Sequence, residues 1–283
     1  MPHVPLYFDS HMHTPLCKHA YGEPEAYAEQ GLAMGLKGII VTCHSPMPRG
    51  FWPGVRMGME EFDQYVALVT RAAEACRGQI EVRLGMESDY FPGFEDWITE
   101  LHQMADFHYC LGSVHWQGAD YRKRFDTGDV KAFRSTYFRL LADSAETGLF
   151  DCLAHPDLIK NYKSQLWDFE QVRDEVATAL DRIAKTGVAM ELNTSGVQKS
   201  YEEMNPGLNM LQMMAERSIP VVLGSDSHKP SRVAEGFIEG LHTLKLAGYH
   251  KVSVFEHRRR GELLIDDVLA SLRATVPAAA VEL

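Results

Sequence analysis

Short apolar segments alternate with longer amphipathic segments along almost the whole chain. The apolar segments are rich in valine, isoleucine, leucine and aromatic residues and show little polar alternation, which is typical of strands buried on both faces. They comprise residues 4–8, 38–43, 80–86, 107–114, 151–154, 188–192, 221–224 and 252–255. The pattern therefore predicts seven or eight buried strands.

The segments between the strands carry apolar residues at the spacing of amphipathic helices. Glycine follows four of them, at the position where a helix C-cap is expected. Examples are residues 23–34, 60–76, 130–147, 169–185 and 209–217. Repeated strand–helix alternation without a dividing linker predicts an α/β protein, a single domain over residues 1–283 whose parallel sheet closes into a TIM-like barrel. An open doubly wound sheet is the alternative, but no glycine-rich nucleotide motif supports it.

Composition narrows the functional classes. The chain has 283 residues, of which 45% are hydrophobic and 24% charged, so it can bury a large core. Its formal net charge of −11 argues against wrapping long nucleic acid. An acidic protein can still bind phosphate where metal ions reverse the local field.

Cysteine usage and hydropathy indicate the compartment. The five cysteines are widely spaced and contain no CxxC, which argues against a disulfide framework or a thiolate zinc site. No apolar stretch approaches the roughly 20 residues of a membrane span, and the amino terminus lacks a signal-peptide pattern. We expect a soluble cytoplasmic protein without a membrane partner; the sequence carries no signal for its oligomeric state.

Potential metal ligands follow six of the first seven predicted strands. In an α/β barrel the carboxyl ends of all strands meet at one face, so these side chains should lie together. A lone histidine is more often a hydrogen-bonded polar residue, but seven of the 13 histidines fall at these positions. Imidazole and carboxylate without thiolate suit zinc, iron or manganese. The candidate ligands are His11, His13, His19, His44, Glu87, His115, His155, Asp226 and His228.

The remaining histidines and the basic run have ordinary interpretations. We expect His108 to lie within its strand as a hydrogen-bonded group. The basic run at residues 257–260 is expected to be a solvated helix start rather than a nucleic-acid site. Surface positions are expected for His3, His102, His242, His250 and His257.

The ordered motifs resemble those of the polymerase and histidinol phosphatase (PHP) family, and they span nearly the whole chain. The matching pieces are His11-Met12-His13 with His19, the strand-end His44, Gly85-Met86-Glu87, Gly112-Ser113-Val114-His115, Ala154-His155-Pro156 and Gly224-Ser225-Asp226-Ser227-His228. Residues 17–19 and 193–196 look like the stand-alone histidinol-phosphatase branch. The branch tends to continue with a basic pair beginning with arginine, whereas this chain has Val197, Gln198 and Lys199.

The resemblance implies a distorted barrel of about seven strands with three divalent ions. His11, His13, Glu87 and Asp226 would hold the first ion. Glu87 would bridge to a second ion held by His115 and His155. The third would be held by His19, His44 and His228.

The expected activity is that of a phosphomonoesterase, most specifically a histidinol-phosphatase in histidine biosynthesis, with a hydroxide between two ions attacking phosphorus. Glu87, Asp226 and His228 are the candidate catalytic residues. The candidate substrate contacts are Lys160, Lys199 and Arg232 for phosphate, and Asp89, Tyr90, Trp52 and Trp116 for the amine and imidazole. The alternatives are action on another small phosphate ester or a nucleotide or DNA end, and a metal-binding scaffold without turnover.

Overall fold

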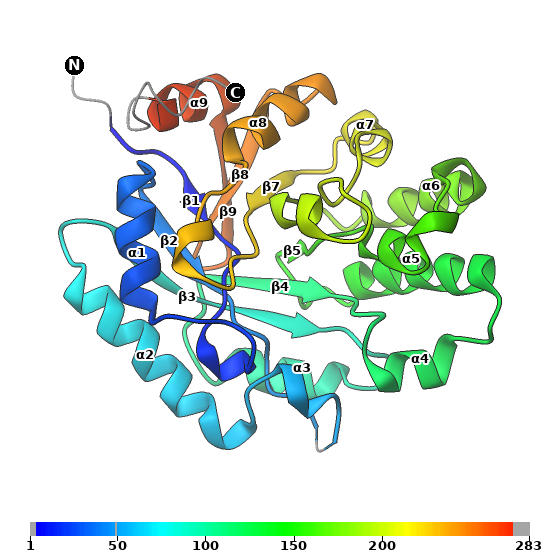
Figure 1. The fold of residues 1–283 in the computed structure, drawn as a ribbon, viewed down its shortest axis with the longest axis horizontal. Helices are drawn as coiled ribbons and strands as arrows, with labels where there is room; N and C mark the ends of the chain where they lie inside the picture. The colour runs from blue at the N-terminus through cyan, green and yellow to red at the C-terminus, as the bar shows by residue number, and fades with distance from the viewer. Residues whose placement is uncertain (1–3, 49, 274–283) are drawn as a thin grey trace.

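Seven parallel strands follow one another around a barrel in the order in which they occur along the chain (Figure 1). The computed structural model describes residues 4–48 and 50–273. The strands are β1 (Phe8–Asp9), β2 (Gly38–Val41), β3 (Glu81–Asp89), β4 (Tyr109–Ser113), β5 (Cys152–Leu153), β6 (Ala189–Asn193) and β7 (Val221–Gly224). This sequential order confirms the expected barrel, since a doubly wound sheet reverses its strand order at a switch point.

Helices follow the strands and cover the outside of the barrel (Figure 1). They are α1 (Pro24–Ala33), α2 (Phe62–Ala75), α3 (Glu95–Gln103), α4 (Ala119–Phe125), α5 (Val130–Glu146), α6 (Arg173–Ile183), α7 (Leu208–Glu216), α8 (Phe237–Leu246) and α9 (Ile265–Arg273). Helix α5 begins where the Asp129 side chain accepts a hydrogen bond from the Ala132 N–H, and a left-handed Gly148 lies just beyond its end. No helix in the described part of the chain is long and apolar enough to cross a membrane.

The barrel is joined between β7 and β1 mainly by side chains and short bridges. The Tyr7 hydroxyl accepts a hydrogen bond from the Leu223 N–H at 2.9 Å and donates one to the Ser253 carbonyl at 3.2 Å. Farther along, the His13 N–H donates to the Ser227 carbonyl at 2.9 Å, and the Ser227 N–H donates to the His11 carbonyl at 3.1 Å. The barrel is therefore nearly closed, and the first and last strands carry their histidines to the same place.

The expected eighth strand belongs to a separate antiparallel hairpin, β8 (Lys251–Glu256) with β9 (Arg259–Leu264). The expected helix start at residues 257–260 was wrong. His257 and Arg258 have positive φ angles of 45° and 61° and form the two-residue turn of this hairpin, a backbone that continues into a strand rather than a helix. Near the turn, Arg258 pairs with Asp151 at 3.0 Å.

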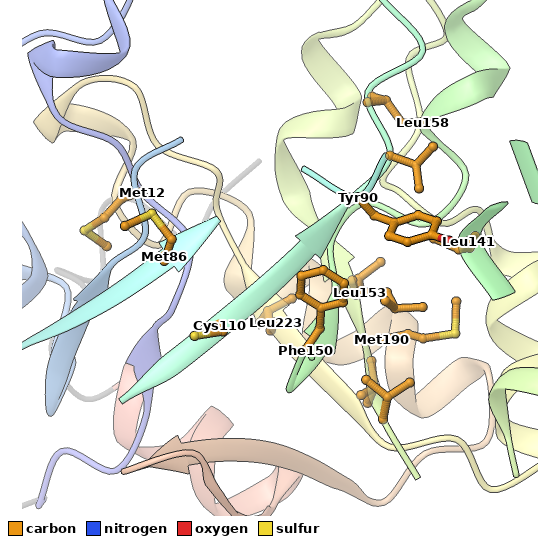
Figure 2. Packing of buried hydrophobic residues seen from close by; sticks show 14 of the residues in the cluster. Met12, Met86, Tyr90, Cys110, Leu141, Phe150, Leu153, Leu158, Met190 and Leu223 are labelled. Atoms are coloured by element: carbon orange, nitrogen blue, oxygen red, sulfur yellow. The ribbon is translucent and has the colours of Figure 1, made fainter. Parts of the chain in front are cut away.

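Two hydrophobic layers hold the barrel. Residues from the strands themselves form an inner cluster that includes Phe8, Ile40, Tyr109 and Val222. Alternate strand residues point the other way and pack beneath the helices. Figure 2 shows part of this outer layer, which includes Leu153, Met190 and Leu223 from the strands and Leu141 from α5. Both layers are buried, which explains the absence of polar alternation in the sequence.

Three of the remaining histidines are where we expected them, since His242, His250 and His257 are exposed. His108 was expected within its strand but lies directly before β4, half-buried, where its Nδ1 accepts a hydrogen bond from the His257 N–H at 3.4 Å. His102 was predicted at the surface but is half-buried, because its Nε2 lies 2.9 Å from the Ser88 hydroxyl in β3. His3 lies outside the described residues.

Tyr65 of α2 provides a test of how the strand ends are held. Its buried hydroxyl lies 2.8 Å from the Val41 carbonyl and 2.7 Å from the Gly85 carbonyl, and it accepts a hydrogen bond from the Cys43 N–H at 3.3 Å. We expect Tyr65→Phe to lower the free energy of unfolding by about 1–3 kcal/mol, because these buried groups lose their partner. Chemical denaturation should show a change within about 0.5 kcal/mol for the exposed control Tyr21→Phe. Equal losses in the two variants would contradict this account.

Candidate metal centre

The nine expected ligands converge at the carboxyl end of the barrel. Glu87 belongs to β3, while the other eight residues lie in the segments that follow β1, β2, β4, β5 and β7. Several sets of three have ligand atoms within 4.8 Å of one another, a spacing that could hold a metal ion. These sets include His11–His13–Asp226, His11–Glu87–His155, His13–His44–Glu87 and His19–His44–His228.

Glu87 lies at the middle of the cluster and is fully buried. One carboxylate oxygen, Oε1, lies 3.1 Å from His155 Nε2 and 3.5 Å from His115 Nε2. The other, Oε2, lies 2.7 to 3.7 Å from ring nitrogens of His44, His11 and His13. The two oxygens therefore face two different groups of imidazoles, which is the arrangement that a bridging carboxylate requires.

Asp226 joins the inner histidines to the solvent-facing edge of the site. Its Oδ1 lies 3.1 Å from His13 Nε2, and its Oδ2 accepts a hydrogen bond from the Ser195 hydroxyl at 3.0 Å. The Asp226 backbone has a positive φ of 51°, a conformation that aspartate adopts more readily than most residues. This turn directs its carboxylate back toward β1.

The outer edge of the site consists of His19 and His228. Their Nε2 atoms lie 2.9 Å apart, a hydrogen-bonding distance when one of them carries the proton, and both rings lie near His44. His19 is exposed and the His228 side chain is 25% exposed, whereas Glu87 is completely buried. Solvent therefore reaches the cluster from the side of these two histidines.

Several buried ligand atoms make no well-oriented hydrogen bond, among them His11 Nε2, His44 Nδ1 and Glu87 Oε2, although the last two lie only 2.7 Å apart. A buried polar atom without a partner is costly, so groups aimed at one another in this way fit a bound cation. Burial alone would raise the pKa of the Glu87 carboxyl, but the rings of His44 and His11 contribute to holding it well below its usual range. Burial lowers the pKa of His44 to about 4 and that of His228 to about 2, whereas Asp226 raises the pKa of the buried His13 to about 9, so this ring would release a proton on binding metal. Ionised carboxylates and neutral imidazoles are the forms that bind metal.

Hydrogen bonds at the far nitrogens orient several of these rings. Glu191 Oε1 lies 2.7 Å from His11 Nδ1, and Asp89 Oδ1 lies 2.7 Å from His115 Nδ1. The Cys17 carbonyl lies 2.7 Å from His19 Nδ1, so the carbonyl accepts when that nitrogen carries the proton. Such partners fix the tautomer and orientation of a ligating histidine.

Glu191 had no predicted role. It is buried in β6, and its Oε2 also accepts a hydrogen bond from the His155 N–H at 2.9 Å. Its place near the end of the sixth strand, the one strand without an assigned ligand, was the available signal. Ser113 was also missed; its hydroxyl donates a hydrogen bond of 2.5 Å to Glu87 Oε1.

Three of the expected substrate contacts lie beside the ligand cluster. The Lys199 ammonium is 3.4 Å from Asp226 Oδ2 and is partly exposed. The Trp52 ring packs edge-on against His115 with 6.0 Å between ring centroids. Asp89 contacts His115, but it also forms a buried ion pair with Arg56 at 2.5 Å.

The other four expected contacts have different partners. Lys160 is fully buried and donates hydrogen bonds to Asp157, Glu203 and the Met204 carbonyl. Arg232 pairs with Glu235, which also accepts a hydrogen bond from Gln198. Tyr90 is buried near Leu141 in the outer core (Figure 2). Trp116 donates to the Leu158 carbonyl at 3.2 Å.

Known structures share this fold. A histidinol phosphate phosphatase from Lactococcus lactis, solved with zinc, L-histidinol and phosphate, superposes with a TM-score of 0.77 at 18% identity, covering 90% of this chain and 98% of that one. A putative histidinol phosphatase from Listeria monocytogenes superposes with a TM-score of 0.72 at 20% identity, covering 81% and 98% of the two chains. At these identities the likeness establishes the barrel fold.

Sequence relatives extend over nearly the full length. A probable histidinol-phosphatase from Deinococcus radiodurans is 36% identical over 257 residues, which are 89% of this chain and 97% of the relative. A histidinol-phosphatase from Bacillus subtilis is 27% identical over 266 residues, or 82% and 98% of the two chains. The profile of the PHP domain matches residues 9–195. The chain therefore belongs to the PHP domain family.

Proposed function

We propose that this protein is a metal-dependent histidinol-phosphatase, which converts L-histidinol phosphate and water to L-histidinol and phosphate. The observation that carries the proposal is the buried Glu87 carboxylate, whose two oxygens face separate groups of imidazoles. The names of the relatives from Deinococcus radiodurans and Bacillus subtilis support this substrate.

The chain offers enough donors for three divalent ions, with zinc, iron and manganese suited to the donor set. His11, His13, Glu87 and Asp226 would hold the first ion. The second would be held by Glu87 with His115 and His155, and the third by His19, His44 and His228. When bound, such ions neutralise phosphate charge and activate water for in-line attack.

The chain itself would orient the substrate at the open edge of the cluster. A phosphate monoester would approach from the side of His19 and His228, because these ligands face solvent. Lys199 lies at this edge and would contact an outer phosphate oxygen. Its partial exposure leaves the ammonium free to turn from Asp226 toward a more highly charged phosphate.

The organic part of the substrate carries an imidazole and an amine. Trp52, beside His115, offers an aromatic surface for the imidazole. The protein's formal charge of −11 favours a cationic amine over a second anionic group. These features support histidinol phosphate over sugar or nucleotide phosphates.

The substrate can be tested by comparing kcat/KM for histidinol phosphate with a panel of sugar, nucleoside and amino-acid phosphates. The panel should include a phosphodiester and a DNA end, with verified metal-free protein as the control. We expect histidinol phosphate to be preferred by at least tenfold and the metal-free protein to be inactive. A tenfold preference for another substrate would overturn this assignment, and absence of turnover on the whole panel would favour a binding scaffold.

The bridging role of Glu87 predicts a large catalytic effect. We expect Glu87→Gln to lower kcat at least ~100-fold, about 2.7 kcal/mol of transition-state stabilisation, because one substitution weakens two ion sites. His108→Asn is the control, since His108 lies before β4, at the opposite end of that strand from the cluster. Similar kinetic losses in these two folded variants would show that the site is misplaced.

The hydrogen bond that Glu191 accepts from His11 predicts a separate effect on metal affinity. Glu191→Gln replaces one acceptor oxygen with an N–H donor, so it should weaken zinc binding by roughly 10- to 100-fold. Competition with a chromogenic chelator measures this affinity directly. The exposed Glu216→Gln serves as the control and should leave it unchanged. Wild-type affinity in Glu191→Gln would exclude the orienting role.

A further inference from the structure

We infer that Arg56 is a positioning residue that holds the metal ligand His115 and the aromatic surface of Trp52 as one unit. Arg56 lies in the segment between β2 and α2, outside every motif that identified the family. Its side chain is 3% exposed, and it reaches across to the end of β3. The effect on His115 is independent of the substrate, whereas the effect through Trp52 rests on the proposed function.

Each nitrogen of the Arg56 guanidinium has a different partner. Nη2 forms the 2.5 Å ion pair with Asp89 Oδ2, and Nη1 donates to the Ser45 carbonyl at 3.1 Å. Nε donates to the Trp52 carbonyl at 3.3 Å. Ser45 directly follows the ligand His44, so one planar group contacts three segments that border the metal centre.

The ion pair continues to the metal ligand through Asp89. While Oδ2 of Asp89 is held by Arg56, Oδ1 lies 2.7 Å from His115 Nδ1. The opposite nitrogen of this ring, Nε2, faces Glu87 at 3.5 Å. Arg56 therefore fixes the carboxylate that in turn fixes the ring. Without Arg56, Asp89 would be a buried carboxylate free to rotate away from His115.

The same guanidinium supports an unusual backbone at Trp52. Trp52 has φ 40° and ψ 58°, a left-handed conformation that is unfavourable for a bulky side chain and persists only where its surroundings hold it. Arg56 binds the carbonyl of this residue and lies 5.9 Å from the centre of its ring. A side chain at Gly118 would approach the Trp52 ring to 3.2 Å, so the indole also packs closely against the Gly118 backbone.

Arginine is required for this combination of contacts. Its planar fork presents Nε, Nη1 and Nη2 in three fixed directions, whereas lysine offers a single ammonium on a flexible stem. Lysine could keep the charge beside Asp89 but could not reach both carbonyls at the same time. Arg56→Lys should therefore retain part of the effect, and Arg56→Met should lose all of it.

Arg134 of α5 provides a matched control. It is also buried, donates hydrogen bonds to the carbonyls of Leu166, Tyr162 and Lys163, and lies 5.0 Å from the centre of the Trp167 ring. Arg134 thus holds a loop beside a tryptophan through backbone carbonyls, and none of these partners is a candidate metal ligand. Arg134→Met reports the cost of losing a buried arginine as such.

The test is release of zinc from the loaded, full-length protein into a chromogenic chelator. We expect Arg56→Met to release one zinc ion per chain at least ~10-fold faster than wild type, as for the loss of other groups that orient ligands. Arg134→Met should release zinc at the wild-type rate even if its melting temperature falls. Wild-type release from Arg56→Met, or equally fast release from Arg134→Met, would overturn the inference. If Arg56→Met does not fold, Arg56→Lys takes its place, with intermediate release expected and wild-type release contradicting the role.

A double-mutant cycle tests the route through Asp89. In an Asp89→Asn background, Arg56→Met should change the zinc release rate less than ~2-fold, because the connection to His115 is already broken. Fully multiplicative effects would exclude that route. With histidinol phosphate, Arg56→Met should also raise KM through Trp52 and lower kcat through His115. If histidinol phosphate is not a substrate, only this kinetic arm is lost, and zinc release still decides the role of Arg56.

Discussion

The burial of one carboxylate among histidine rings is the constraint on which the rest of the site depends. Glu87 has no solvent exposure, and five imidazoles approach its two oxygens. A buried anion is tolerated only when it is paired with cations or binds metal. The surrounding side chains must therefore be held in fixed positions around the carboxylate. The barrel supplies that geometry because every strand end contributes a residue at the same face.

A second set of residues fixes the rings without touching the centre. Glu191 and Asp89 each hold a histidine at 2.7 Å, and Arg56 fixes Asp89 in turn. These groups are themselves buried and satisfied by further hydrogen bonds. The site therefore consists of three layers of residues. An inner carboxylate is surrounded by imidazoles, and these are held by an outer hydrogen-bond network that extends into the segments between strands and helices.

The barrel and all nine clustered residues could be predicted from the sequence. Short apolar runs alternate regularly with amphipathic segments, and histidines or carboxylates recur just after these runs. The β8–β9 hairpin was missed since its turn depends on two left-handed residues, His257 and Arg258, that are neither glycine nor asparagine. Arg56 was missed for a different reason. Two of its three partners lie 11 and 33 residues away in the sequence, and no local pattern marks a buried long-range ion pair. Lys160 was expected to contact phosphate, but it is completely buried. A single charged residue after a strand carries no sequence signal for such burial.

The seam between β7 and β1 has a consequence for the order of assembly. His19 and His228 meet across 209 residues of chain, and His13 meets Asp226 across 213. Such distant contacts are slow to form because most of the loop must be ordered first. During synthesis, the histidines near the amino terminus emerge long before the residues that complete their site. A partly made chain can therefore present some of these ligands to passing ions, but it cannot hold the full cluster until Asp226 and His228, which follow β7, have left the ribosome. Assembly of the complete site therefore waits for this late segment of the chain.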